Sequence, residues 1–107
     1  MGEFKHLAVV KFKDGAAVDE ILKGLQDLIS QVDTVKSFEW GQDLESHEMV
    51  RQGFTHVFTV TFGTKDEFDA YVAHPKHVEF STVFLAAIEK VVVLDFHSIS
   101  VKPTPAA

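Results

Sequence analysis

A chain of 107 residues with 46% hydrophobic residues, a net charge of −6 and no cysteine has the length of one small domain. Its negative charge argues against nucleic-acid binding, which needs a basic surface. The lack of cysteine excludes disulfides and thiolate metal ligands. No apolar run is long enough to cross a bilayer, and residues 1–6 lack the apolar core of a signal peptide. We therefore expect a single domain over residues 1–107 that is cytoplasmic and binds neither nucleic acid nor a membrane.

Hydrophobic periodicity alternates between strand and helix spacing along the chain. Apolar residues at every second position predict a strand over residues 4–13, which the turn pair Asp14-Gly15 ends. Helical spacing then predicts a helix over residues 17–32. The remaining chain predicts, in order, a strand at 35–41, a polar irregular connection at 43–53, a strand at 54–62, a broken helix from 64, a strand at 91–101 and a disordered tail at 102–107.

The predicted order, β-α-β-β-α-β, is typical of a ferredoxin-like α+β fold with helices on one face of the sheet. The opposite face would carry Leu7, Val9 and Val57 beside threonines, which is too apolar to remain in water. The mean hydropathy of +0.07 is also high for so short a chain. We therefore expect two copies to press these faces together as a homodimeric α+β barrel.

The second helix has to break near His74-Pro75, because proline lacks an N–H and disfavours helical geometry in the residue before it. A new helix from Pro75 would place His77 in its first turn, where the positive end of the helix dipole favours neutral imidazole. A neutral imidazole can act as a general base. Helical spacing places His77 on one stripe with the following residues: Phe80, Ser81, Phe84, Leu85 and Ile88.

The strand phases place His6 and His56 on the aromatic-rich face beneath the helices, where Tyr71 and His77 also point. These four residues could converge on one pocket. A tyrosine hydroxyl and a neutral imidazole in an apolar cavity can polarise a carbonyl and move a proton, as enolate and aldol chemistry requires. The alternative is structural: hydrogen-bonded core histidines, and a tyrosine whose hydroxyl bonds a backbone carbonyl.

The other histidines have simpler interpretations. His47 and His97 are expected at the surface or an interface, and the His74 ring is expected to cap backbone at the helix break. Pro75 prevents His74 and His77 from aligning on one helix, which argues against a metal site there.

Several motifs together resemble the plant stress-responsive A/B barrel (Dabb) family, over residues 4–96. They are Lys5-His6, Lys11-Phe12-Lys13, Trp40-Gly41-x-Asp43, Gly53-Phe54-Thr55-His56, Thr61-Phe62 and Tyr71-x-x-His74-Pro75-x-His77-Val78-x-Phe80. The resemblance implies a dimeric α+β barrel of two ferredoxin-like protomers.

The resemblance also implies candidate chemistry. One branch of the family cyclises a linear poly-β-keto thioester by intramolecular aldol condensation, and its tyrosine and histidine match Tyr71 and His77. Phe58 departs from that branch by placing a bulky ring where a smaller residue would leave room for an alkyl tail. The candidate substrate-binding residues are His6, His56, Ala8, Val10, Leu22, Leu25, Phe58, Val60, Phe80 and Phe84.

The family further implies a cation, taken here as a structural Mg²⁺, on the main-chain carbonyls of Ile29, Val32 and Val35. Free carbonyls and the negative end of the helix dipole make such a site physically sensible. No cofactor is expected to be required for the chemistry.

Three functions follow. The first is a polyketide cyclase-like enzyme in which His77 is the base and Tyr71 orients or polarises the carbonyl. The second is a non-catalytic stress-response protein, either a stable dimeric scaffold or a binder of apolar small molecules. The third is a cofactor-free oxygenase-like dimeric barrel, which rests on analogy of fold alone.

Overall fold

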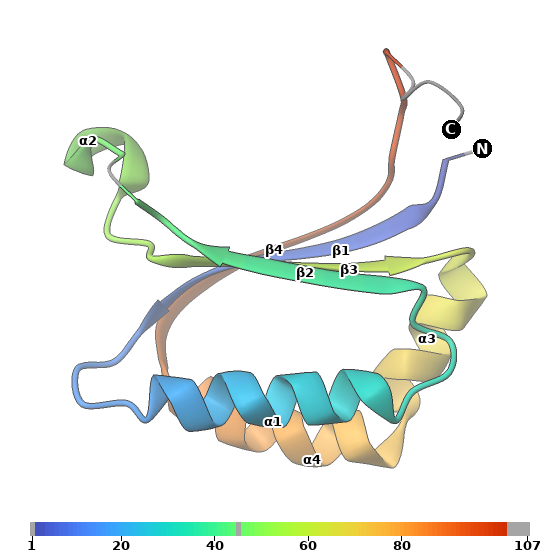
Figure 1. Ribbon diagram of the computed structural model, residues 1–107, viewed down its shortest axis with the longest axis horizontal. Coiled ribbons are helices and arrows are strands. Elements are labelled where there is room, and N and C mark those ends of the chain that lie inside the picture. Colours follow the sequence, from blue (N-terminus) through green and yellow to red (C-terminus); the bar gives the residue numbers. More distant parts are fainter. Residues whose placement is uncertain (1, 45, 103–107) are drawn as a thin grey trace.

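A computed structural model of the chain describes residues 2–44 and 46–102. Helices α1 and α4 lie side by side in one layer beneath a twisted sheet (Figure 1). The elements in order are β1 (Phe4–Phe12), α1 (Val18–Ser30), β2 (Ser37–Gln42), α2 (Glu48–Arg51), β3 (His56–Phe62), α3 (Lys65–Ala73), α4 (Pro75–Ala86) and β4 (Ile88–His97).

The four strands form one antiparallel sheet in the order β2-β3-β1-β4. This arrangement confirms the ferredoxin-like α+β fold. The central strand β1 sets the register of the site, because His6 pairs with Val60 on one side and with Asp95 on the other. The pairing also places His56 opposite Val10, four residues further along β1.

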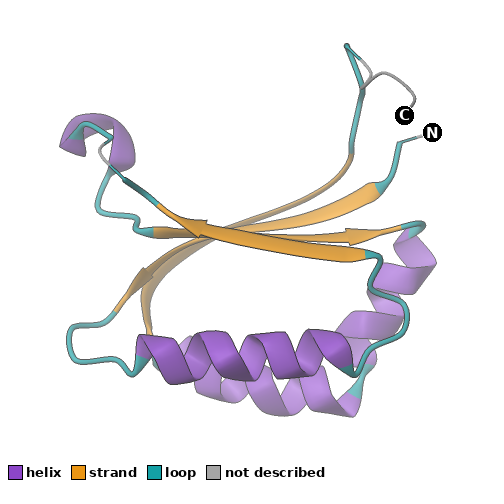
Figure 2. Ribbon diagram, in the orientation of Figure 1, coloured by secondary structure: helices purple, strands orange, loops and turns teal. Residues whose placement is uncertain are grey.

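Helices cover one face of the sheet, and Figure 2 shows the purple helical layer beneath the orange strands. On that face, alternate residues of β1 are buried against the apolar stripe of α1, which supplies Ile21, Leu25 and Leu28. The other side of the sheet, which we call the outer face, carries Leu7, Val9, Val57, Val92, Leu94 and Phe96. Val57, Val92, Leu94 and Phe96 are exposed there. An apolar face of this kind is typical of a protein-protein interface.

The predicted irregular connection at residues 43–53 was wrong in one respect, because it contains the short helix α2. The Nδ1 atom of His47 accepts a hydrogen bond from the Met49 N–H at 3.2 Å and caps the helix, while Gln52 ends it in a left-handed conformation. The Phe54 N–H donates to the Arg51 carbonyl, so β3 begins at His56 and not at the predicted Phe54.

The last strand was predicted too late. It begins at Ile88, which pairs with Phe12, and it ends at His97, where its partner β1 begins. Ile88 is therefore a strand residue and not part of the α4 stripe, and Leu85 is 60% exposed. Strand β2 begins two residues later than predicted. Of the predicted tail, only Lys102 is described, and residues 103–107 lie outside the described part of the chain.

Within the described ranges, no helix is both long enough and apolar enough to span a membrane.

Candidate functional site

The break between α3 and α4 brings the two candidate catalytic side chains together. Helix α3 ends at Ala73, and His74 adopts an extended conformation with φ −63° and ψ 132°. Its Nδ1 atom accepts a hydrogen bond from the Lys76 N–H at 3.1 Å, which confirms the predicted capping role of His74. Pro75 then begins α4, as its fixed φ allows. As a result, the Tyr71 and His77 ring centroids are 4.6 Å apart.

Burial sets the protonation of both groups. Tyr71 is 3% exposed, and burial raises the pKa of its phenol to about 12, so the hydroxyl remains a proton donor at neutral pH. No hydrogen bond to this hydroxyl is found among the described residues. The structural alternative, a tyrosine that bonds a backbone carbonyl, is therefore not what the structure shows.

Burial also favours the neutral form of His77. Burial lowers the pKa of His77, with smaller contributions from His6 and His74, and the Val72 carbonyl acts in the opposite direction. The His77 Nδ1 atom is nevertheless buried with no hydrogen-bond partner in the described structure. A neutral imidazole that lines the inner cavity is suited to accept a proton from a bound molecule at its other nitrogen, Nε2.

A cavity of about 180 Å³ lies between the sheet and the helical layer beside this pair. Its walls are mainly aliphatic and aromatic, and its polar groups come from His6, Tyr71, His77 and Ser81. The lining residues are His6, Ala8, Leu25, Phe38, Phe58, Val60, Tyr71, His77, Phe80, Ser81, Phe84, Leu85, Val91 and Val93. We call this space the inner cavity.

The inner cavity opens towards β4 and is closed at the opposite end. Leu85, Val91 and Val93 line it and are exposed, whereas Phe58 is 4% exposed. The Phe58 ring packs against Phe84, with 6.0 Å between centroids. A ligand would therefore enter between α4 and β4 and meet Phe58 at the closed end.

His6 lines the inner cavity, and the carboxylate of Asp95 fixes the orientation of its ring. Its Nδ1 atom lies 2.5 Å from an Oδ1 atom of Asp95, its cross-strand neighbour. A carboxylate at Nδ1 holds the proton there and leaves Nε2 as the free nitrogen. Asp95 was not among the predicted site residues, although an acid within the apolar run 91–96 was a usable signal.

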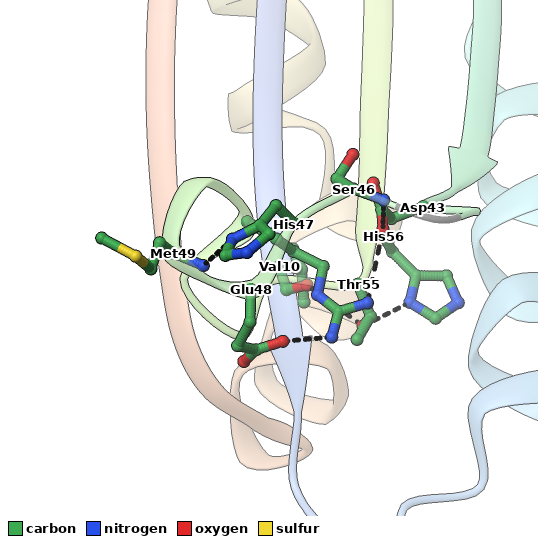
Figure 3. Close-up of polar contacts among 9 residues, drawn as sticks. Val10, Asp43, Ser46, His47, Glu48, Met49, Thr55 and His56 are labelled. Atoms are coloured by element: carbon green, nitrogen blue, oxygen red, sulfur yellow. Dashed lines mark hydrogen bonds and ion pairs between the residues drawn. The ribbon is translucent and has the colours of Figure 1, made fainter.

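Three candidate binding residues do not line the inner cavity. His56 lies at the far end of β3, where its Nδ1 atom is 2.8 Å from the Thr55 hydroxyl (Figure 3). Burial lowers the pKa of His56, and its ring packs edge-on against Phe12. Val10 is fully buried, and Leu22 packs against the core. The predicted convergence of four residues is therefore wrong for His56, because it has the right face but the wrong position along the strand.

The two remaining histidines lie at the surface. His47 is exposed and caps α2 (Figure 3). His97 is exposed and packs its ring edge against Phe4, with 5.2 Å between centroids.

The carbonyls predicted to hold a cation lie in the last turn of α1, at Ile29, and in the loop after it, at Val32 and Val35. The Ile29 carbonyl accepts hydrogen bonds from the Gln31 and Val32 N–H groups. The Val32 carbonyl accepts one from the Val35 N–H and retains a lone pair. The Thr34 hydroxyl between them is buried without a partner in the described chain. Oxygen donors of this kind fit Mg²⁺. Separately, no cluster of three or more acidic or histidine side chains that could hold a metal is found among the described residues.

Fold and cavity together define a ferredoxin-like α+β protein with a tyrosine-histidine pair in an apolar space between its layers. The profile of the stress responsive A/B barrel domain matches residues 4–98. The chain belongs to this family.

Two relatives are similar to this chain over most of its length. A stress-response A/B barrel domain-containing protein of Arabidopsis thaliana is 62% identical over 104 residues, which cover 97% of this chain and 94% of the relative. Olivetolic acid cyclase of Cannabis sativa is 34% identical over 95 residues, which cover 86% of this chain and 93% of that enzyme.

Solved structures extend the comparison. The hydroxynitrile lyase of Passiflora edulis has a TM-score of 0.84 and 27% identity, and the match covers 95% of this chain and 98% of the lyase. A dimeric ferredoxin-like protein of Thermobifida fusca has a TM-score of 0.76 at 20% identity and covers 92% and 93% of the two chains, which shows the shared fold alone.

Proposed function

We propose that this chain is a homodimeric A/B barrel enzyme that binds a small apolar carbonyl compound and catalyses lyase-type proton transfer and carbon-carbon bond chemistry without a cofactor. The observation that carries the proposal is the His77 ring, which lies 4.6 Å from the Tyr71 ring on the wall of the apolar inner cavity. Burial lowers the pKa of His77 and raises that of Tyr71, which favours the neutral imidazole that a general base needs and the protonated phenol that a hydrogen-bond donor needs.

The reaction that fits these groups is an intramolecular aldol condensation of a poly-β-keto thioester, as the similarity to olivetolic acid cyclase suggests. His77 takes a proton from the acidic carbon between two carbonyls, and the Tyr71 hydroxyl donates a hydrogen bond to the enolate oxygen. The enolate carbon attacks a distant keto carbon, and the new alkoxide takes the proton back from the imidazolium. The new carbon-carbon bond closes the ring, loss of water and enolisation make it aromatic, and hydrolysis of the thioester by water releases the thiol and leaves the carboxylate.

The inner cavity limits the size of the ligand. Its volume of about 180 Å³ is below the roughly 300–1,000 Å³ of sites that enclose drug-sized ligands. The reacting part of a substrate can therefore lie beside His77, while a longer substituent would extend past Leu85 and Val93 to solvent. Phe58 closes the other direction, so we propose a short-chain or aryl substrate.

The test supplies the purified protein with short-chain poly-β-ketoacyl thioesters, made in situ by a polyketide synthase, and measures carboxylated aromatic product. We expect His77→Ala to lower kcat/KM by about 10²–10⁴-fold, the usual contribution of a general base, and Tyr71→Phe to lower kcat. His47→Ala is the matched control, because that histidine lies outside the cavity on α2. Product formation that is equal in all four proteins would refute the mechanism.

The second candidate is a non-catalytic stress-response protein that binds an apolar molecule. The 62% identical relative is named for its domain and for stress response and not for a reaction, and Phe58 fills part of the cavity. Calorimetric titration with short aryl ketones separates the two functions. A binder without turnover would keep its affinity in His77→Ala and give no product with any thioester.

The homodimer is part of this proposal. It is supported by the apolar outer face and by the dimeric solved structure of the same fold. We further propose a structural Mg²⁺ on the Ile29, Val32 and Val35 carbonyls, with the Thr34 hydroxyl nearby. Removal of divalent cations with a chelator is expected to lower the Tm, and added Mg²⁺ to restore it. We place the protein in the cytoplasm on the composition of the chain.

A further inference from the structure

Two apolar projections flank the outer face, one at each end of the strands. Helix α2 and the chain after β4 both rise on the side of the sheet opposite α1 and α4 (Figure 1). We call residues 98–102 the C-terminal arm. Its Ile99 and Val101 side chains are 86% and 93% exposed. The arm has a fixed starting point, because the Ser98 N–H donates to the Glu3 carbonyl at 2.8 Å.

The projection at the other end covers a hollow, which we call the outer pocket. It has a volume of about 480 Å³ and lies beneath α2. Val9, Val57 and Val92 line it, so its floor is continuous with the outer face. Val50 of α2 also lines it and is 76% exposed. Val57 and Val92 nevertheless remain 38% and 43% exposed within one protomer.

The polar part of the outer pocket is incomplete within one protomer. Arg51 pairs with Glu48 and lies 3.4 Å from an Oδ2 atom of Asp43, but its Nε atom is buried without an acceptor in the described structure. Figure 3 shows Asp43 and Glu48 gathered at this end of the sheet. The Arg51 side chain as a whole is 33% exposed, so an extended peptide would place a carbonyl oxygen against its accessible N–H groups.

Symmetry determines which part of a second copy reaches the outer pocket. A two-fold axis that lies between two stacked outer faces and runs across the strands exchanges the two strand ends. The arm of each copy then meets α2 of the other. An axis parallel to the strands would instead bring α2 against α2. The cluster of Asp43, Glu48 and Arg51, which has two acids and one base, would then face the same cluster of the other copy.

We propose that the outer pocket binds the C-terminal arm of a second copy of this chain. The dimer then has two such contacts, which the two-fold axis relates, and we call this arrangement the clasp. Ile99 and Val101 supply apolar side chains for the valine floor, and Lys102 brings a positive charge towards Asp43 and Glu48. The inference rests on the homodimer proposed above and adds its axis and its locking contact.

Disulfide trapping tests the contact directly, because the chain has no cysteine of its own. The variant with both Val50→Cys and Ile99→Cys is oxidised and examined on a non-reducing gel. The two positions lie at opposite strand ends, and residues 4 and 10 of β1, which mark those ends, are about 20 Å apart. A disulfide within one chain is therefore excluded, since it requires Cα atoms within about 7 Å.

We expect the double variant to form a covalent dimer, and each single variant to remain uncrosslinked. The pair Val50→Cys with Val78→Cys is the control, because Val78 is exposed on α4 in the helical layer. Crosslinking of Val50→Cys alone would show that α2 meets α2 and would overturn the proposal. A sedimenting dimer that gives no Val50–Ile99 crosslink would also overturn it, while leaving the homodimer intact.

Sedimentation of the unlinked protein separates this inference from the one on which it rests. We expect Ile99→Asp combined with Val101→Asp to raise the dimer dissociation constant by about tenfold or more, whereas Val78→Asp leaves it unchanged. A wild-type protein that is monomeric at all concentrations would refute the homodimer itself. Unchanged dimer affinity in the arm variant would refute the clasp alone.

Discussion

Replacement of His77 by leucine is expected to stabilise the protein while removing its activity. The His77 Nδ1 atom is buried and has no partner among the described residues. A buried polar atom in this condition costs about 1–3 kcal/mol, and leucine has nearly the volume of histidine without the polar atom. In a domain of this length, 1 kcal/mol corresponds to a Tm change of about 4–8 °C. The Tm of His77→Leu should therefore rise by at least several degrees.

The matched control is His74→Leu, three residues earlier in the same helix break. His74 accepts the Lys76 N–H as the cap of α4, and loss of such a cap costs about 0.5–2 kcal/mol. The two substitutions are chemically identical, yet their effects on Tm should have opposite signs. Thermal unfolding is followed by circular dichroism at one fixed protein concentration, because dimer formation makes the Tm depend on concentration. A Tm that falls equally in both variants would show that His77 is a structural histidine.

Three further predictions concern pH, the acid on β4 and the closed end of the inner cavity. Burial lowers the pKa of His77 and His56 in the folded state, so the unfolded chain binds more protons than the folded chain once the pH is below about 6.5. The free energy of unfolding should therefore decrease as the pH falls from 6.5 towards 5. Urea unfolding at both pH values measures this change, and a change of opposite sign would contradict the prediction. Asp95→Asn should lower kcat about tenfold or more by releasing the His6 tautomer and should alter the pH-rate profile, with Asp95→Glu restoring part of the activity; an unchanged profile would show that the pair is only structural. Phe58→Val should admit ligands with longer alkyl chains at a cost of about 2–4 kcal/mol in stability, measured by calorimetric titration and urea unfolding, and unchanged ligand selectivity would mean that Phe58 does not close the cavity.

Sequence patterns sufficed for features that depend on local chemistry. The alternation in residues 4–12 predicted β1 and its buried face, and Pro75 predicted the helix break with His74 as its cap. The proximity of Tyr71 and His77 followed from that break. Each of these features is determined by residues within one or two turns of one another, which is the range over which propensity and periodicity are informative.

Features that depend on strand pairing were not accessible in the same way. Alternation places His56 on the inner face, but only the register shows that it lies opposite Val10, while His6 lies opposite Val60. Four residues along a strand separate the two sites by about 13 Å. Asp95 was missed for the same reason, because its bond to His6 exists only across the β1–β4 pair. The short helix α2 escaped prediction because it is held by a histidine cap and a left-handed Gln52 and not by an apolar stripe.

The helix break is also what makes the proposed chemistry geometrically available. His77 follows Tyr71 by six residues, and in a continuous α-helix those side chains would be separated by about 240° around the axis and would point to different faces. The extended backbone at His74 redirects the chain before α4 begins, which brings the two rings to 4.6 Å. The same turn exposes the first N–H groups of α4, and His74 satisfies one of them at Lys76. One histidine of the motif thus stabilises the break that orients the other, so the Tyr-x-x-His-Pro-x-His pattern specifies a structure and a site together.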